Sequence, residues 1–246
     1  MYFWKCWRDS RARLIAYVAV IGLFVLVITV SAEISPDAWT GDRTKGFLYL
    51  WGRVLGTSRL LIPFLALGFA ASGVGEEFAQ RTAEFLLTRP RSRRYFVWMG
   101  WAAGAAQLLL LASAYLMVAF IALLYRTKTA FAWEFLSPIV PLFILGVLVY
   151  SLTYLMTASL RSGRNGYASG LGIVIFYRTL VWLLQSRWDI HPPSPTDLLV
   201  PLSVAVGGAQ AGGSGLPFPL VAAVGWTLVA LACPLAAQFV VERMEV

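Results

Sequence analysis

The sequence predicts an all-α integral membrane protein with six transmembrane helices. Of its 246 residues, 59% are hydrophobic and only 13% are charged, and the mean hydropathy is +0.72. This is more apolar sequence than a globular protein needs to fill its core. Several uncharged stretches can each cross about 30 Å of hydrocarbon as a helix. The charged interval at residues 76–94, called the connector below, separates two of these stretches. We therefore expect a single transmembrane domain over residues 1–246.

The first part of the chain combines an interfacial segment with the first span. Residues 1–13 carry aromatic and basic side chains at helical spacing, which predicts an amphipathic helix at the membrane surface, with an ordinary basic flank as the alternative. Residues 14–32 are uncharged and form the first span. A signal peptide is disfavoured, because the apolar stretch is too long and further spans follow. Polar residues 33–51 predict an external loop with room for a short helix.

The remaining spans follow from the uncharged stretches beyond that loop. Residues 95–125 exceed the length of one crossing, so this helix must tilt, kink or project into water. Residues 198–210 are too short to cross, which predicts a re-entrant or interfacial segment before the last span. The predicted second to sixth spans are residues 54–75, 95–125, 135–160, 166–186 and 217–241.

The basic residues predict the orientation. More than half of the 20 Lys and Arg residues lie in the N-terminal segment, the connector, the basic turn at 161–165 and the C-terminal tail, which six spans place on one side. The positive-inside rule makes that side cytoplasmic. We expect a multi-pass protein of the cell membrane, the inner membrane of a bacterium or archaeon, with both termini in the cytoplasm.

The residues that carry chemistry in other classes of protein are sparse. The net charge of +8 does not come with a basic stripe interleaved with aromatics, so nucleic acid is not an expected partner. His191, Cys6 and Cys233 are far apart in the sequence and predict no metal site. The phosphate-binding G-x-x-x-x-G-K-[ST] loop is absent, and the spans contain no Asp. We expect no enzyme activity and no cofactor bound by this chain.

The connector carries the most specific pattern. Residues 81–93, RTAEFLLTRPRSR, resemble the pattern that type-2 ABC exporter permeases carry after their second span: an acidic residue, Gly-Thr-x-Glu-x-Leu-Leu, two variable residues and Pro-x-Ser-Arg. Glu77 takes the acidic position, and Arg81 replaces the usual Gly. The matching residues are Thr82, Glu84, Leu86, Leu87, Pro90, Ser92 and Arg93.

The resemblance implies a fold and a set of partners. Two such permeases, identical or related, sit on two separate ATP-binding-cassette ATPase subunits that bind ATP and Mg. The connector is then a coupling helix that docks into a cleft on the ATPase, and the N-terminal helix lies beside it. The implied cargo is lipid-like, amphipathic or a peptide. The residues implied to contact the ATPase are Glu77, Phe78, Arg81, Thr82, Glu84 and Phe85.

The residues of the connector favour the same role on physical grounds. A helix over residues 76–88 places Phe78 and Phe85 on one side and polar groups on the other, which suits a protein partner. Pro90 disfavours helix at the residue before it, and Ser92 can cap a third span that begins at Arg93. The alternative is a solvated loop whose arginines only orient the protein.

Arg178 and two glycine pairs are the remaining candidates. Arg178 lies inside the fifth span, where it either extends to the interface or faces a substrate path and attracts an anionic group such as a lipid phosphate. The pairs Gly100/Gly104 and Gly166/Gly170 allow close helix approach, by default within one subunit. Because the resemblance places the fifth span at the dimer contact, Gly166 and Gly170 are also candidates for that contact. The alternative function is an ATP-independent membrane transporter or a structural subunit of a membrane complex.

Overall fold

The computed structural model describes residues 11–31, 43–79, 93–128, 139–188 and 220–243, and within these ranges the chain forms six helices and no strand. Five helices contain a stretch long and apolar enough to cross a membrane. The prediction of an all-helical, multi-pass membrane protein is therefore confirmed at this level. The helices are α2 (Arg11–Ser31), α3 (Arg43–Ala79), α5 (Arg93–Thr127), α6 (Ile139–Leu160), α7 (Gly163–Trp188) and α9 (Leu220–Glu242). The five stretches are Leu50–Ala71, Arg93–Tyr125, Ile139–Leu160, Gly163–Trp188 and Ala223–Glu242, and α2 contains a shorter one, Leu14–Leu23.

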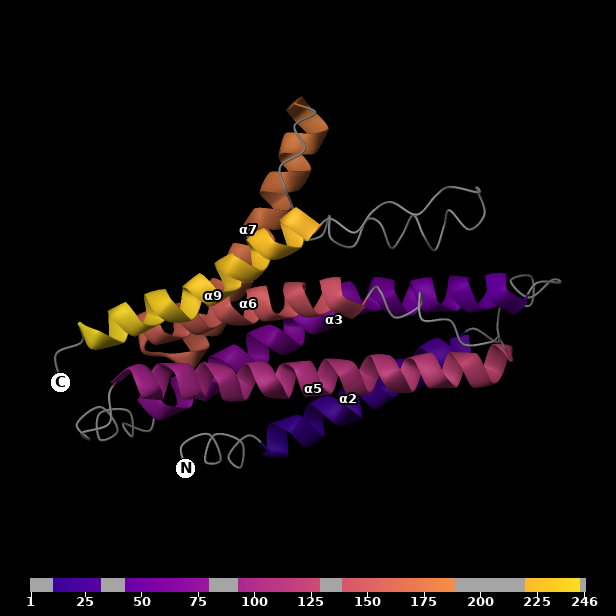
Figure 1. Ribbon diagram of the computed structural model, residues 1–246, viewed down its shortest axis with the longest axis horizontal. Coiled ribbons are helices and arrows are strands. Elements are labelled where there is room, and N and C mark those ends of the chain that lie inside the picture. The colour runs from indigo at the N-terminus through magenta and orange to yellow at the C-terminus, as the bar shows by residue number, and fades with distance from the viewer. Residues whose placement is uncertain (1–10, 32–42, 80–92, 129–138, 189–219, 244–246) are drawn as a thin grey trace.

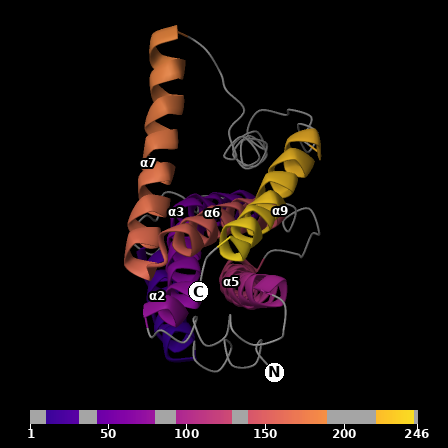
Figure 2. The same ribbon diagram turned by 90° about the vertical axis from the view of Figure 1, so that its left-hand side faces the viewer.

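Helix α6 is the centre of the bundle, because it packs against α3, α5, α7 and α9 (Figures 1 and 2). Two of its tyrosines bond to the backbone of α5. The Tyr154 hydroxyl donates to the carbonyl of Val97 at 2.8 Å, and the Tyr150 hydroxyl donates to the carbonyl of Trp101 at 3.1 Å. A Cβ atom at Gly104 would overlap Tyr150, so this glycine makes room for the tyrosine. Gly104 thus packs within the chain, which is the default expectation for the Gly100/Gly104 pair.

The second glycine pair also packs inside the chain. Gly166 and Gly170 on α7 are buried, and a Cβ atom at either position would overlap Thr157 or Thr153 of α6. The threonine side chains occupy the space over the glycines. Packing within one subunit therefore accounts for this pair, and the position of the two glycines gives no support to their assignment to the dimer contact.

Helix α3 begins much earlier than the second span was predicted to begin. The sequence predicts a loop up to residue 51, whereas the helix starts at Arg43 and continues without a break into the membrane stretch. The reason is an apolar stripe at helical spacing, in which Phe47 and Trp51 pack edge-on against Phe120 of α5 with ring centroids 5.7 and 5.3 Å apart. The polar residues of this segment hide the stripe in the sequence.

The turn between α6 and α7 is shorter than the predicted turn at 161–165. Arg161 adopts a left-handed backbone conformation with φ 51°, which ends α6. Ser162 then caps α7, since its hydroxyl oxygen accepts from the amide of Asn165 at 3.3 Å. Helix α7 starts at Gly163, three residues before the predicted start of the fifth span.

Helix α7 diverges from the rest of the bundle (Figures 1 and 2). It contacts α6 and α3 near its start and then leads away from them, so that most of its second half is exposed. Tyr167, Leu171 and Val174 pack partly against the core, and beyond them no apolar residue of α7 joins it. The helix therefore has one anchored end and one end that stands away from the other described helices.

Candidate functional site

The two flanks of the connector lie at one end of the bundle. Helix α3 ends at Ala79 and α5 begins at Arg93, at the same end as the last turn of α6, the first turn of α7 and the last turn of α9 (Figure 1). Residues 76–79 thus continue α3. Helix α5 begins at Arg93, the residue after Ser92, which is the start that a cap at Ser92 predicts. Among the predicted ATPase contacts, Arg81, Thr82, Glu84 and Phe85 lie outside the described residues, as do most of the interfacial helix at 1–13 and the whole segment 198–210.

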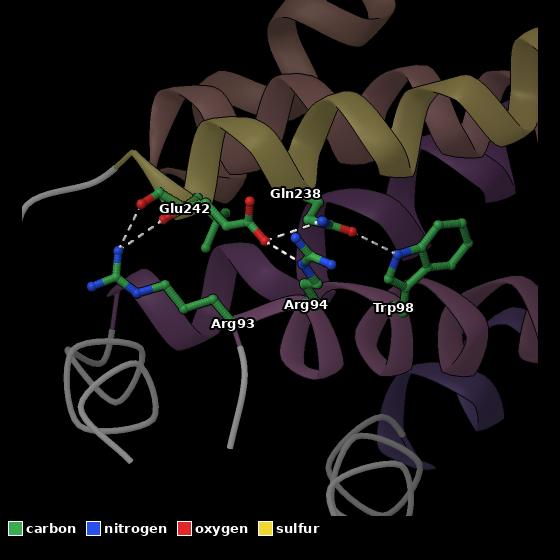
Figure 3. Close-up of polar contacts among 6 residues, drawn as sticks. Arg93, Arg94, Trp98, Gln238 and Glu242 are labelled. Carbon is green, nitrogen blue, oxygen red and sulfur yellow. Dashed lines mark hydrogen bonds and ion pairs between the residues drawn. The ribbon is translucent and has the colours of Figure 1, made fainter. Parts of the chain in front are cut away.

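Two arginines tie the start of α5 to the end of α9 (Figure 3). The Arg94 guanidinium forms an ion pair with Glu242, with Nε 2.8 Å from Oε1. The Arg93 guanidinium donates to the backbone carbonyl of Glu242 at 3.0 Å and to that of Val241 at 3.4 Å. The carbonyls at a helix C-terminus lack intrahelical partners and carry partial negative charge, so cations are favourable there. The connector therefore leads into a helix fastened to the last helix of the chain.

A side-chain amide extends this tie toward the membrane (Figure 3). The indole nitrogen of Trp98 donates to Oε1 of Gln238 at 3.0 Å, and Nε2 of Gln238 donates to Glu242 at 3.1 Å. Gln238 is buried, and both ends of its amide are bonded. Trp98, Gln238, Glu242, Arg93 and Arg94 form one polar cluster, which we call the α5–α9 clamp.

The other flank of the connector is held by close backbone packing. Gly75 of α3 lies against Gly163 at the start of α7, and a Cβ atom at Gly75 would overlap the Gly163 backbone and come within 3.0 Å of Thr157. A Cβ atom at Gly163 would overlap the carbonyl oxygen of Ala71. The last two turns of α3 are thus fixed to α7 and α6 by contacts that leave no room for a side chain.

Glu77 does not have the position expected of a residue that contacts a partner protein. It is the acidic residue of the connector pattern, and its side chain is only 8% exposed, within the last turn of α3. The role of Glu77 as a contact to an ATPase therefore stays a prediction. Phe78 belongs to the same turn of α3.

These contacts form a frame around the connector. One flank is fixed to α7 and α6 and the other to α9, so a displacement of the connector would reach α3 and α5 directly and would reach α6, α7 and α9 through them. In the part of the chain that the structure describes, no three His, Cys, Asp or Glu residues gather as metal ligands would.

Arg178 lies on α7 away from this frame. It is exposed, and its positive charge acts on the guanidinium of Arg59 on α3. Arg59 is itself half-buried within the stretch Leu50–Ala71. The two arginines, distant in the sequence, are thus brought into electrostatic contact.

The sequence did not reveal the clamp. Trp98 and Gln238 are separated by 140 positions, and no local pattern marks two such residues as partners. The only signal was a carboxylate at the end of the last span, Glu242, on the side where arginines collect. Pairing it with Arg94 required the helix order in space.

Comparison with known proteins gives one family. A family model described as "Protein of unknown function (DUF2705)" matches residues 38–192, more than half of the chain. The match begins just before α3 and ends just after α7, so it includes both flanks of the connector. Comparison with curated proteins gives no match.

Proposed function

The chain belongs to the family described as "Protein of unknown function (DUF2705)", and we propose, from the connector pattern, that it is the transmembrane permease subunit of an ATP-binding-cassette exporter. Two permeases, identical or related, enclose an outward path for a lipid-like, amphipathic or peptide substrate. Separate ATPase subunits bind ATP and Mg and dock on the connector. Closure of the ATPases moves the connector and, through it, the transmembrane helices.

The single observation that carries this proposal is the connector pattern at residues 81–93, with its acidic partner at Glu77. The contacts at the flanks supply a physical reason for the role. Both flanking helices are tied to other helices close to the connector, through Gly75 on one side and Arg93 and Arg94 on the other. A rigid attachment of this kind is what force transmission between a motor subunit and a membrane path requires.

The finer details of the arrangement belong to the proposal. The chain crosses the membrane six times with α2 as the first crossing, both termini lie in the cytoplasm, and residues 1–13 lie at the surface. Because Glu77 is buried in α3, the contact with the ATPase is made by the part of the connector beyond it. We assign that contact to Arg81, Thr82, Glu84 and Phe85, and we give Glu77 the role of holding the end of α3.

Co-purification tests the proposal. The full-length chain, tagged and expressed in its native membrane, should retain an ATP-binding-cassette ATPase after mild detergent extraction, and Glu84→Ala should reduce the retained ATPase about tenfold. Glu134→Ala is the matched control, because it removes a carboxylate from the loop on the opposite side and should leave retention unchanged.

The same experiment separates the alternative functions. If the purified chain carries no ATPase and both variants behave alike, the exporter proposal is refuted. An ATP-independent transporter would then be indicated by transport driven by an ion gradient. A structural subunit would be indicated by a stable complex with membrane proteins that do not hydrolyse ATP.

A further inference from the structure

Pro234 divides α9 into two parts with different attachments. In the part after it, Ala237 and Val241 belong to the hydrophobic core. Gln238 and Glu242 of the same part belong to the α5–α9 clamp (Figure 3). The last two turns of α9 are thus held both by apolar packing and by hydrogen bonds to a neighbouring helix.

The longer part of α9, before Pro234, is held less firmly. Among residues 223–233, whose side chains the structure describes, none belongs to the hydrophobic core. The buried residues of this part are Ala223, Ala230 and Cys233. Because these side chains are small, their burial removes little apolar surface from the surroundings and fixes this part weakly to its neighbours.

The hydrogen-bond ladder of α9 is weakened where the two parts meet. Pro234 has no N–H, so the carbonyl of Ala230 lacks the donor that an α-helix normally supplies four residues on. The thiol of Cys233 donates to the carbonyl of Val229 at 3.3 Å. One turn earlier, the hydroxyl of Thr227 donates to the carbonyl four residues before it at 2.8 Å. A hydroxyl bonded in this way often bends a helix.

Pro63 of α3 shows that a proline inside a helix does not by itself give this arrangement. Core residues flank it on both sides, with Ile62 directly before it and Leu65 two positions after it. A bend at Pro63 would therefore pull packed residues apart on both sides. At Pro234 the core lies on one side only, so a bend there leaves the packed part of α9 in place.

We propose that Pro234 is a hinge, at which the part of α9 before it swings while the last two turns stay fixed to α5. The moving part begins at the end of the bundle opposite the connector (Figure 1). Val224 lies about 15 Å from Pro234 along the helix, so a change of about 20° at the proline moves it by about 5 Å. The hinge does not depend on the proposed exporter function.

Pulsed electron paramagnetic resonance on the full-length protein tests the hinge. Both native cysteines are replaced by alanine, and spin labels are attached to Val224→Cys and Leu110→Cys, two positions that are exposed on α9 and α5. The matched pair combines Leu110→Cys with Phe239→Cys, an exposed position after Pro234. We expect the distances of the Val224 pair to spread about 5 Å more widely than those of the Phe239 pair.

Two proline substitutions complete the test. Pro234→Ala restores the missing donor and should narrow the spread of the Val224 pair to that of the Phe239 pair. Pro63→Ala is the control and should leave both spreads unchanged. The Phe239 pair also shows whether each variant keeps its fold, because it joins two positions that the hinge does not move apart.

Three outcomes would overturn the proposal. Equal spreads of the two pairs in the chain with Pro234 would show that α9 moves as one rigid helix. An unchanged spread of the Val224 pair in Pro234→Ala would show that the proline is not the point of bending. Equal narrowing by Pro63→Ala would show a general stiffening of the bundle. The exporter function is tested by ATPase retention, so the two proposals can fail separately.

Discussion

Two glycines of α7 have opposite surroundings, although they lie only six residues apart. A Cβ atom at Gly166 would overlap Thr157 of α6, and it would lie 2.6 Å from the Cα atom of that residue, which cannot move without the backbone. A Cβ atom at Gly172 would have no atom within 4 Å. The same substitution therefore tests close packing at one position and helix propensity at the other.

We predict that Gly166→Ala destabilises the protein by about 1 to 3 kcal/mol, as overpacking of a filled interior does. Gly172→Ala should be neutral or stabilise it by up to about 1 kcal/mol, because alanine favours helix. The free energy of unfolding in mixed micelles measures both. If the two variants have equal stability, α7 does not pack on α6 through its glycines.

Gln238 is the buried member of the α5–α9 clamp. Gln238→Leu would leave the Trp98 indole N–H without its acceptor and would remove the hydrogen bond that Gln238 donates to Glu242. An unsatisfied buried donor costs about 1 to 3 kcal/mol. We predict a loss of this size in unfolding free energy. Gln185→Leu, at an exposed position of α7, is the control and should change stability little. Retention of full stability in Gln238→Leu would contradict the clamp.

At the scale of the helices, the sequence predicts the membrane-spanning stretches well, but it predicts poorly how far a helix extends beyond its stretch and which residues are buried there. The start of α5 at Arg93 and the ends of α6 and α9 lie within a residue or two of their predicted places, because uncharged runs and a capping serine mark them. The start of α3 was missed by about ten residues, because Arg43 and its polar neighbours mask an apolar stripe that only packing on α5 reveals. The burial of Glu77 was missed for a similar reason, since it depends on which helices surround the end of α3.

The extension of α3 depends on its contact with α5. Phe120 lies against both Phe47 and Trp51 and is 2% exposed. We predict that Phe120→Ala lowers the unfolding free energy by about 3 kcal/mol or more, because a buried ring is lost and a cavity remains. Phe176→Ala removes a ring that is 68% exposed and should cost far less. A similar cost for both variants would mean that the aromatic contact does not hold the extension in place.

At the scale of the whole molecule, each end of the bundle has an exposed residue at which a cysteine can show on which side of the membrane the connector lies. Arg161 lies in the turn between α6 and α7, at the connector's end, and Lys128 follows α5 at the other end. Both are exposed and both have a backbone φ of 51°, so a cysteine at either position meets a similar local conformation. Cys6→Ser removes the cysteine outside the spans, and Cys233 is buried in α9.

We predict that a membrane-impermeant maleimide labels Lys128→Cys in intact cells and labels Arg161→Cys only after permeabilisation. The reason is the excess of Lys and Arg at the connector's end, which favours the cytoplasm for that end. The Cys6→Ser variant, which keeps only Cys233 and carries no added cysteine, should stay unlabelled in both conditions. The reverse pattern would put the connector outside the cell, where no ATP-hydrolysing subunit could dock on it. In that case the helical frame around the connector would need a different partner, and the exporter proposal would be lost even though the fold stands.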